Sequence, residues 1–381
     1  MNPRGAAVGV GVEDVGAKPR AGRSALRGAL RGVWTVLGPF VGLLLIIALF
    51  AYLTRKPGMP LVEACLNAMF LEKYNWQMIA QQTVILWIAA LGMTVVMIAG
   101  GIDLSVGSLV ALVTVAIALA VKGFDVQLPV SLGGQHWQLP GVPLVVALIG
   151  GVLLGGLCGL FNGAFITGLR VVPFIITLGS MRIFRGLAKW LAGNNTVNVP
   201  AATWTTRIGQ VLRERVLVIE PRPEWLVVAP GVWLALALSV VMATVLHYSL
   251  FGRHAYAVGS NEATARLCGL NVPRQKLAIY ALAGLATGLA GALQFLKLSV
   301  GDPTTADGLE LEVIAAVVIG GGSLSGGEGT VLGTLIGCLI ITTLRSGCTQ
   351  ADIPDAAQDV IIGAIIVAAV AIDRLRRGRA S

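Results

Sequence analysis

Long apolar runs recur along this chain and constrain its fold more than any other feature. Hydrophobic residues make up 56% of the 381 residues and charged residues only 12%, whereas a soluble domain carries about a quarter charged residues. Runs of about 20 apolar residues match the length that a helix needs to cross a ~30 Å hydrocarbon core. They must be helical, because lipid leaves no water to satisfy open backbone groups. The sequence therefore predicts an all-α polytopic membrane protein.

The apolar runs divide into about ten expected transmembrane helices. Their approximate ranges are 33–53, 78–98, 105–121, 142–168, 173–192, 226–247, 277–297, 311–322, 329–345 and 357–373. The first is too long for the apolar core of a signal peptide, so we interpret it as an uncleaved anchor. The eighth is short for a full crossing. The expected organisation is a basic, flexible tail at 1–32, a membrane domain at 33–373 and a basic tail at 374–381.

The net charge of +9 is distributed as a membrane topology rather than as a nucleic-acid surface. Basic residues cluster before the first span and after the last, at Lys18, Arg20, Arg23, Arg27, Arg31, Arg374, Arg376, Arg377 and Arg379. The positive-inside rule then predicts that both termini are cytoplasmic, which agrees with an even number of spans. Segments 122–141 and 194–225 fall outside. The loop after the sixth span is basic and falls in the cytoplasm.

That cytoplasmic loop holds a short polar segment with complete helix start and stop signals. Ser260 and Asn261 are capping residues, Glu262 falls in the first turn, Arg266 in the last, and Gly269 ends the segment. We expect a helix at about 262–268. A capped helix this short has no role within a bilayer, so it is expected to bind a cytoplasmic partner. The residues assigned to this contact are Asn261, Glu262, Ala263, Arg266, Leu267 and Gly269.

Glycine produces two further patterns. Glycines recur at four-residue spacing at 151/155/159, 284/288 and 329/333/337, and such small faces predict close helix packing. The segments 96–107 and 317–326 also resemble each other, since both combine an apolar run, glycines, Leu-Ser and a further glycine. Paired, glycine-interrupted segments in two halves of a chain indicate a substrate route at the repeat interface. The chain is therefore expected to contain two pseudo-repeated halves.

Several polar residues lie at expected membrane depth and are candidates for a substrate pathway. They are Asp103, Ser105, Asn162, Thr177, Gln294, Ser323 and Ser325. A carboxylate in a bilayer is costly and faces a pore or a partner, but Asp103 could instead cap the helix that begins near Ser105. The neutral groups suit an uncharged polyol, or serve as helix–helix contacts. Arg182, Arg185 and Lys189 share one helix face, either as a pore wall or as an interfacial anchor.

Catalytic and metal-binding patterns are missing from the sequence. No Gly-x-x-x-x-Gly-Lys-Ser/Thr loop occurs, and the histidines and cysteines lack the spacing of a metal site. We therefore expect no catalysis, no metal and no cofactor in this chain. Cys65 and Cys348 both fall on the outer side and could pair, although small apolar filling is the favoured role of all five cysteines.

Four motifs together resemble those of one family, the permeases of bacterial ABC-type monosaccharide importers of the ribose/xylose type. They are Ala99-Gly-Gly-Ile-Asp-Leu-Ser-Val-Gly-Ser108, Pro173-Phe-Ile-Ile-Thr-Leu-Gly-Ser-Met181, Phe251-Gly-Arg253 with Gly259-Ser-Asn-Glu262, and Leu311-Glu-Val-Ile-Ala-Ala-Val-Val-Ile-Gly320. The resemblance covers about residues 35–375. Ser260 stands where a second glycine is common, and the charged 194–225 loop is not a hallmark of the family.

The resemblance implies a multi-pass permease in the bacterial inner membrane. It implies a homodimer that binds a pair of cytoplasmic ATP-binding subunits, receives sugar from an extracytoplasmic solute-binding protein, and uses the 262–268 helix as its coupling segment. One alternative is a permease for a branched-chain amino acid or a nucleoside. A second is a secondary transporter, for which only Asp103 offers an intramembrane carboxylate. A third is a membrane enzyme, for which no catalytic group is apparent.

Overall fold

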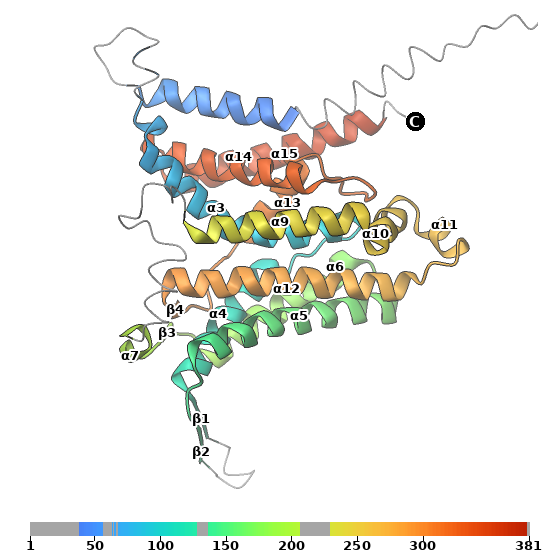
Figure 1. The fold of residues 1–381 in the computed structure, drawn as a ribbon. Coiled ribbons are helices and arrows are strands. Elements are labelled where there is room, and N and C mark those ends of the chain that lie inside the picture. The colour runs from blue at the N-terminus through green and yellow to red at the C-terminus, as the bar shows by residue number, and fades with distance from the viewer. Residues whose placement is uncertain are drawn as a thin grey trace, which may run out of the picture.

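The computed structural model describes residues 38–55, 63, 65, 68–127, 136–205 and 229–378. Within these ranges long helices lie side by side along a common direction (Figure 1). The helices are Gly38–Leu53, η1 (Met69–Leu71), α3 (Lys73–Ile98), α4 (Val106–Lys122), α5 (Leu144–Leu169), α6 (Pro173–Leu191), α7 (Ala201–Thr205), α9 (Pro230–Tyr248), α10 (Leu250–Ser260), α11 (Glu262–Leu267), α12 (Val272–Leu298), α13 (Leu309–Ile319), α14 (Val331–Gln350) and α15 (Asp355–Gly378).

A helix occupies each of the ten expected spans, which confirms the polytopic helical fold. In the described part of the chain, five helices are both long and apolar enough to cross a membrane alone, namely α3, α5, α9, α12 and α14. Gly38–Leu53 and α4 are apolar but shorter. α15 stays helical to Gly378, past the expected end of the last span at 373. The expected tail at 1–32 lies outside the described residues.

Two small antiparallel strand pairs accompany the helices, which the all-α expectation did not include. β1 (Phe124–Gln127) pairs with β2 (His136–Leu139), and β3 (Val197–Asn198) pairs with β4 (Val300–Gly301). Both pairs lie at the end of the bundle opposite α10 and α11 (Figure 1). The second pair joins the segment after α6 to the segment that precedes α13.

Glycine faces bring α5 and α12 into backbone contact. A Cβ atom added to Gly155 or Gly159 of α5 would overlap the backbone of α12 at Gly284 and Gly288. The expected packing role of these two stripes is confirmed. The third stripe is only partly helical, because Gly329 lies in the loop before α14. Gly333 and Gly337 of that stripe pack against Gly320 and Ala316 at the end of α13.

Side-chain hydrogen bonds join α3 to α14. Thr83 contacts Thr342, and Thr94 contacts Thr334, each with an oxygen–oxygen distance of 2.7 Å. Neutral hydroxyl pairs of this kind connect helices where water is absent. The proposed Cys65–Cys348 pair is not formed, since both cysteines are free and Cys348 is buried.

The eighth expected span is a broken crossing rather than a continuous helix. α13 has only 11 residues, which corresponds to about 16 Å of helix against a core of ~30 Å. The preceding segment completes the crossing without helical structure: Gly301 lies against Val115 and Ala118 of α4, and the carbonyl of Ala306 lies against Gly107. Left-handed backbone at Ala306 (φ 57°) and Gly308 (φ 80°) turns this segment into α13.

Candidate functional site

The predicted short polar helix is present as α11, at Glu262–Leu267. The Asn261 side chain accepts a 3.0 Å hydrogen bond from the backbone nitrogen of Thr264, and Gly269 adopts φ 83° at the stop. The predicted cap and stop are therefore confirmed. Ser260 does not cap this helix, because it is the last residue of α10.

Glu262 fastens α11 to the bundle. Its carboxylate contacts Arg266 at 2.6 Å within α11 and Lys276 of α12 at 2.7 Å. Partial burial acts to raise the pKa of Glu262, but hydrogen bonds from Lys276 and Arg266 outweigh it and hold this pKa below its usual value. The helix is thus held by an ion pair that is complete at neutral pH.

One face of α11 packs against the bundle and the other is exposed. Ala265 is buried and packs in a cluster with Val258 and Val272. Ala263 and Leu267, one turn apart, face outward, and Leu267 is 88% exposed. An exposed leucine beside an exposed alanine on a rigidly capped helix is typical of a protein contact surface.

The end of α10 contacts both glycine-rich loops of the internal repeat. The nitrogen of Gly327, in the second repeat loop, donates a 2.8 Å hydrogen bond to the carbonyl of Ile98 at the end of α3. A Cβ atom on Gly259 would overlap both of these groups. The Tyr256 hydroxyl donates to the carbonyl of Gly329 at 2.7 Å. We name this contact the glycine junction, defined by Ile98, Gly100, Gly259, Gly326 and Gly327.

Four of the seven candidate pathway residues come together in one buried cluster. Asp103 Oδ1 accepts from the nitrogen (2.8 Å) and hydroxyl (2.6 Å) of Ser105, and Asn162 Nδ2 donates to Ser105 Oγ at 2.9 Å. The Thr177 hydroxyl donates to the carbonyl of Ile102 at 3.1 Å. These contacts join the start of α4 to α5 and α6. Asp103 is 4% exposed, so it does not lie at an open membrane edge.

Among the residues that the structure describes, two buried polar atoms at this cluster have no hydrogen-bond partner. They are Oδ1 of Asn162 and the hydroxyl oxygen of Tyr280, a fully buried residue of α12. Tyr280 is a member of the cluster that the sequence did not single out. A tyrosine at helical spacing within an apolar run carries no signal that separates it from the core.

The other three candidates lie elsewhere. Gln294 of α12 donates a hydrogen bond to the hydroxyl of Thr305 at 2.9 Å, in the part of the broken crossing that precedes α13. Ser323 Oγ accepts from the nitrogen of Ser325 at 3.0 Å, which shapes the second repeat loop. The structure therefore divides the predicted set among three places.

Arg185 of α6 supports the turn segment 302–308 that precedes α13. Its guanidinium donates to the carbonyl oxygens of Pro303 (3.1 Å) and Thr305 (2.7 Å) and lies 3.5 Å from the carboxylate of Asp307. Backbone carbonyls outside a helix need such partners at membrane depth. Of the two interpretations of this basic face, the contacts of Arg185 place it toward the protein.

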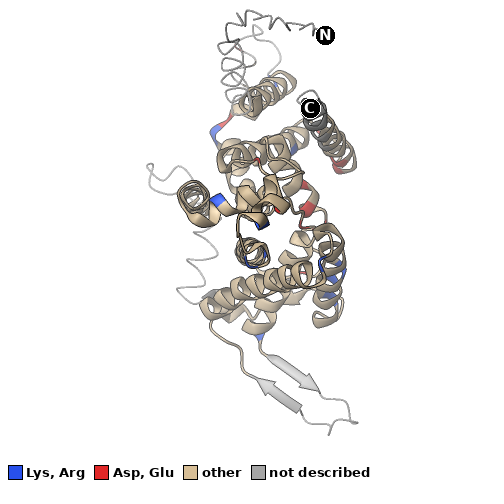
Figure 2. Ribbon diagram, turned by 90° about the vertical axis from the view of Figure 1, so that its right-hand side faces the viewer, with Lys and Arg blue, Asp and Glu red and all other residues tan. Residues whose placement is uncertain are grey.

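A second charged group, absent from the predicted set, lies where α13 meets α14 and α15. Arg345 contacts Glu312 at 2.5 Å and Asp359 at 3.6 Å. Arg345 is 42% exposed although it belongs to an apolar helix. Viewed along the helices, acidic positions and the basic positions of α6 lie on the same side of the bundle (Figure 2). Partly exposed charges at membrane depth face a polar cavity or a partner.

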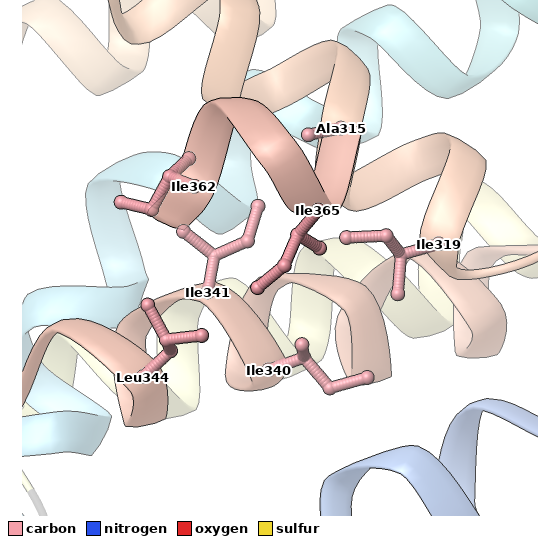
Figure 3. Close-up of a pocket in the computed structure, with 7 residues that line it drawn as sticks. All are labelled: Ala315, Ile319, Ile340, Ile341, Leu344, Ile362 and Ile365. Carbon is pink, nitrogen blue, oxygen red and sulfur yellow. The ribbon is translucent and has the colours of Figure 1, made fainter. Parts of the chain in front are cut away.

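A small pocket between α13, α14 and α15 is a different kind of feature. Figure 3 shows only aliphatic side chains around it, namely Ala315, Ile319, Ile340, Ile341, Leu344, Ile362 and Ile365. A polar solute would lose its hydrogen bonds in such surroundings. The pocket is therefore a packing defect of the bundle and no part of the candidate pathway.

Comparisons with known proteins agree on one type of protein. Residues 75–370 match the family described as the permease component of the branched-chain amino acid transport system. The chain is 36% identical over 343 residues to the ribose import permease protein of Bacillus subtilis (strain 168), covering 90% of this chain and 94% of that protein.

Two further relatives carry the names of other pentose permeases. The xylose transport system permease protein of Escherichia coli (strain K12) is 32% identical over 359 residues, which cover 81% of this chain and 87% of that protein. The L-arabinose ABC transporter permease protein of Azospirillum brasilense is 31% identical over 349 residues, covering 91% of each chain. All three similarities extend over most of the membrane bundle.

Proposed function

This chain belongs to the importer-permease family of the branched-chain amino acid transport system, and we propose that it is the permease subunit of an ATP-driven importer for a monosaccharide. The exposed, capped face of α11 carries this proposal, because it provides a rigid surface for a separate energy-supplying subunit. The sequence holds no Walker loop. ATP hydrolysis is accordingly assigned to a pair of cytoplasmic ATP-binding subunits.

The cargo follows from the named relatives, which import ribose, xylose and arabinose by their names. The neutral hydrogen-bonding groups in the Asp103–Ser105–Asn162 cluster are compatible with an uncharged polyol. A branched-chain amino acid or a nucleoside is the alternative cargo, and a secondary transporter is the alternative mechanism. Competition among these solutes for uptake distinguishes the cargoes.

The remaining parts of the importer are assigned by the same reasoning. The protein lies in the bacterial inner membrane with both termini in the cytoplasm, and the membrane domain spans 33–373 between the two basic tails. An extracytoplasmic solute-binding protein delivers the sugar to the outer end of the bundle, where β1–β2, β3–β4 and α7 lie. A second copy of the permease completes the pathway, with lipid surrounding the pair.

Transport proceeds in this proposal through two states of the bundle. Closure of the ATP-binding pair displaces α11, and the glycine junction passes this displacement to the loops that precede α4 and α14. The pathway then opens alternately to the two sides. Only the difference in contacts between the two states can drive such a change.

The experiment is uptake into proteoliposomes that contain this permease with and without its ATP-binding subunits. We expect sugar uptake only with those subunits, ATP and loaded binding protein. Uptake by the permease alone along a proton or sodium gradient would contradict the proposal. Orientation is tested separately with Gln127→Cys in the β1–β2 hairpin, in a protein whose exposed Cys268 is replaced by serine. An impermeant thiol reagent should label this variant only from outside. A cysteine at residue 210, in the part of the external loop outside the described residues, is the companion test.

A further inference from the structure

The two helices that begin inside the bilayer, α4 and α13, meet at their N-terminal ends. Gly107 lies in the first turn of α4 and Glu310 in the first turn of α13. A Cβ atom on Gly107 would overlap both Glu310 Oε2 and the carbonyl oxygen of Ala306. Because α13 packs along the inner half of α14, from Gly333 to Gly337 and beyond, this meeting point lies at membrane depth.

Glu310 has a carboxylate oxygen that no described residue uses as a hydrogen-bond acceptor. The residue is only 8% exposed, and its Oε2 atom is buried without a hydrogen-bond partner. A buried carboxylate oxygen without a partner is costly. A polar group that the described part of the chain does not supply must offset this cost for the carboxylate to remain charged.

The neighbouring charges determine what that group can be. The Arg185 guanidinium is already engaged with two backbone carbonyls and with Asp307. Its Nε–H and one hydrogen of its second terminal nitrogen remain, but the two carboxylates around it give the group a net negative charge, which disfavours an anionic ligand. The acceptors of the group are Oε2 of Glu310 and the Asp307 carboxylate, which is 88% exposed. A ligand rich in donors and without negative charge fits this arrangement.

We propose that Glu310 and Asp307, the second of which is paired with Arg185, form a binding station for the hydroxyl groups of the transported solute at the break between the turn segment 302–308 and α13. This inference rests on the proposed function and assigns residues to its pathway. Carboxylates accept two hydroxyl hydrogens at once, so a polyol passing the break exchanges water for these acceptors. An amino acid would instead place its own carboxylate beside two others.

The test uses the complete importer in proteoliposomes. Uptake of the parent aldose is compared with uptake of its monodeoxy analogues, and each sugar is presented with a saturating concentration of binding protein. Wild-type uptake should fall roughly ten- to hundredfold for at least one analogue, because a hydrogen bond to a charged group is lost. Glu310→Ala and Glu310→Gln should lower uptake of the parent aldose by a similar factor. Both should also bring the parent-to-analogue ratio close to one.

Two further variants separate binding from folding. Gly107→Ala retains both carboxylates, but its methyl group would overlap Glu310 Oε2 and the carbonyl oxygen of Ala306, so it should displace the station and reproduce the loss of discrimination. Asp302→Asn is the control: the Asp302 carboxylate accepts hydrogen bonds from Thr304 in the same segment but does not line the station. This variant should keep the wild-type ratio of parent to analogue uptake. Equal loss for parent and analogue in Glu310→Ala would show a purely structural role and overturn the proposal. Absence of ATP-dependent uptake in the wild type would instead contradict the proposed function.

Discussion

The backbone nitrogen of Gly327 donates a 2.8 Å hydrogen bond to the carbonyl oxygen of Ile98. This bond connects the two regions that resemble each other in sequence, since Ile98 lies in the segment 96–107 and Gly327 directly follows the segment 317–326. Gly259 of α10 lies against both groups. The end of α10 therefore contacts the two glycine-rich loops at a point where no side chain separates the three backbones.

The glycine junction leads to a first prediction, for Gly259→Ala. The added methyl group would overlap Ile98 and Gly327, and overpacking of this kind costs about 1–3 kcal/mol. We expect the variant to bind the ATP-binding subunits through an unchanged α11 but to lose most uptake. Co-purification and uptake are measured on the same preparation. Gly168→Ala is the control, because no atom lies within 4 Å of its Cβ position, and it should transport normally.

A second prediction concerns the outer face of α11. Ala263 is exposed, so Ala263→Trp should leave the bundle folded while overfilling a complementary cleft on the ATP-binding subunit. Association and uptake should fall together. Ala201→Trp, at an exposed position on the opposite end of the protein, is the matched control and should retain association. Wild-type association of Ala263→Trp would show that α11 is not the coupling element.

A third prediction concerns the C-terminal stop of α11. Gly269 has φ 83°, which a β-branched residue resists. Gly269→Val should therefore increase amide hydrogen exchange in α11 and weaken association with the ATP-binding subunit. Gly269→Asn, which tolerates the left-handed conformation, should behave nearly as the wild type. Equal exchange in the valine and asparagine variants would contradict the assigned stop.

The ion pairs of Glu262 predict a pH dependence. The folded pKa of this carboxylate is lowered, so its contribution to stability is complete above the unfolded value of about 4.3 and is lost as the pH falls below that value. Hydrogen exchange of α11 amides, corrected for intrinsic rates, should be constant from neutral pH to about pH 5 and rise at lower pH. Glu262→Gln should remove this dependence. The same pH profile in wild type and variant would assign the effect to other groups.

Features that depend on neighbouring residues were predictable from the sequence. Asn261 and Gly269 mark the two ends of α11, and the length of each apolar run locates a span, because both signals are local. The helix α10 was not predicted, because Arg253 and His254 within Leu250–Ser260 indicated a basic loop after the sixth span.

Features that depend on distant contacts were not predictable. The turn segment that precedes α13 in the eighth crossing is stabilised by Arg185, more than 100 residues earlier in the chain, and no local pattern predicts that partner. Asp103 and Ser105 are neighbours in sequence, but Asn162 joins them only through the packing of α5. Glu310 was not selected because its carboxylate comes close to α4 only in the folded structure, where α4 and α13 meet.

The last prediction decides between the two roles that the sequence leaves open for Asp103. Its Oδ1 atom accepts from the nitrogen and the hydroxyl of Ser105 just before α4. An asparagine side chain keeps an acceptor at that position, whereas alanine removes it. For a capping role, Asp103→Asn should stay close to the wild type in thermal stability and uptake, and Asp103→Ala should lose about 1–3 kcal/mol of stability.

If Asp103 instead serves the substrate pathway through its negative charge, uptake and stability should respond differently to the two substitutions. Uptake would then fall equally in Asp103→Asn and Asp103→Ala, with thermal stability retained in the asparagine variant. Ser105→Ala is the companion variant, because it removes the acceptor of Asn162 and one donor to Asp103 while leaving the carboxylate in place. We expect Ser105→Ala to follow Asp103→Ala in losing stability, since the same buried hydrogen bonds hold the start of α4 against α5.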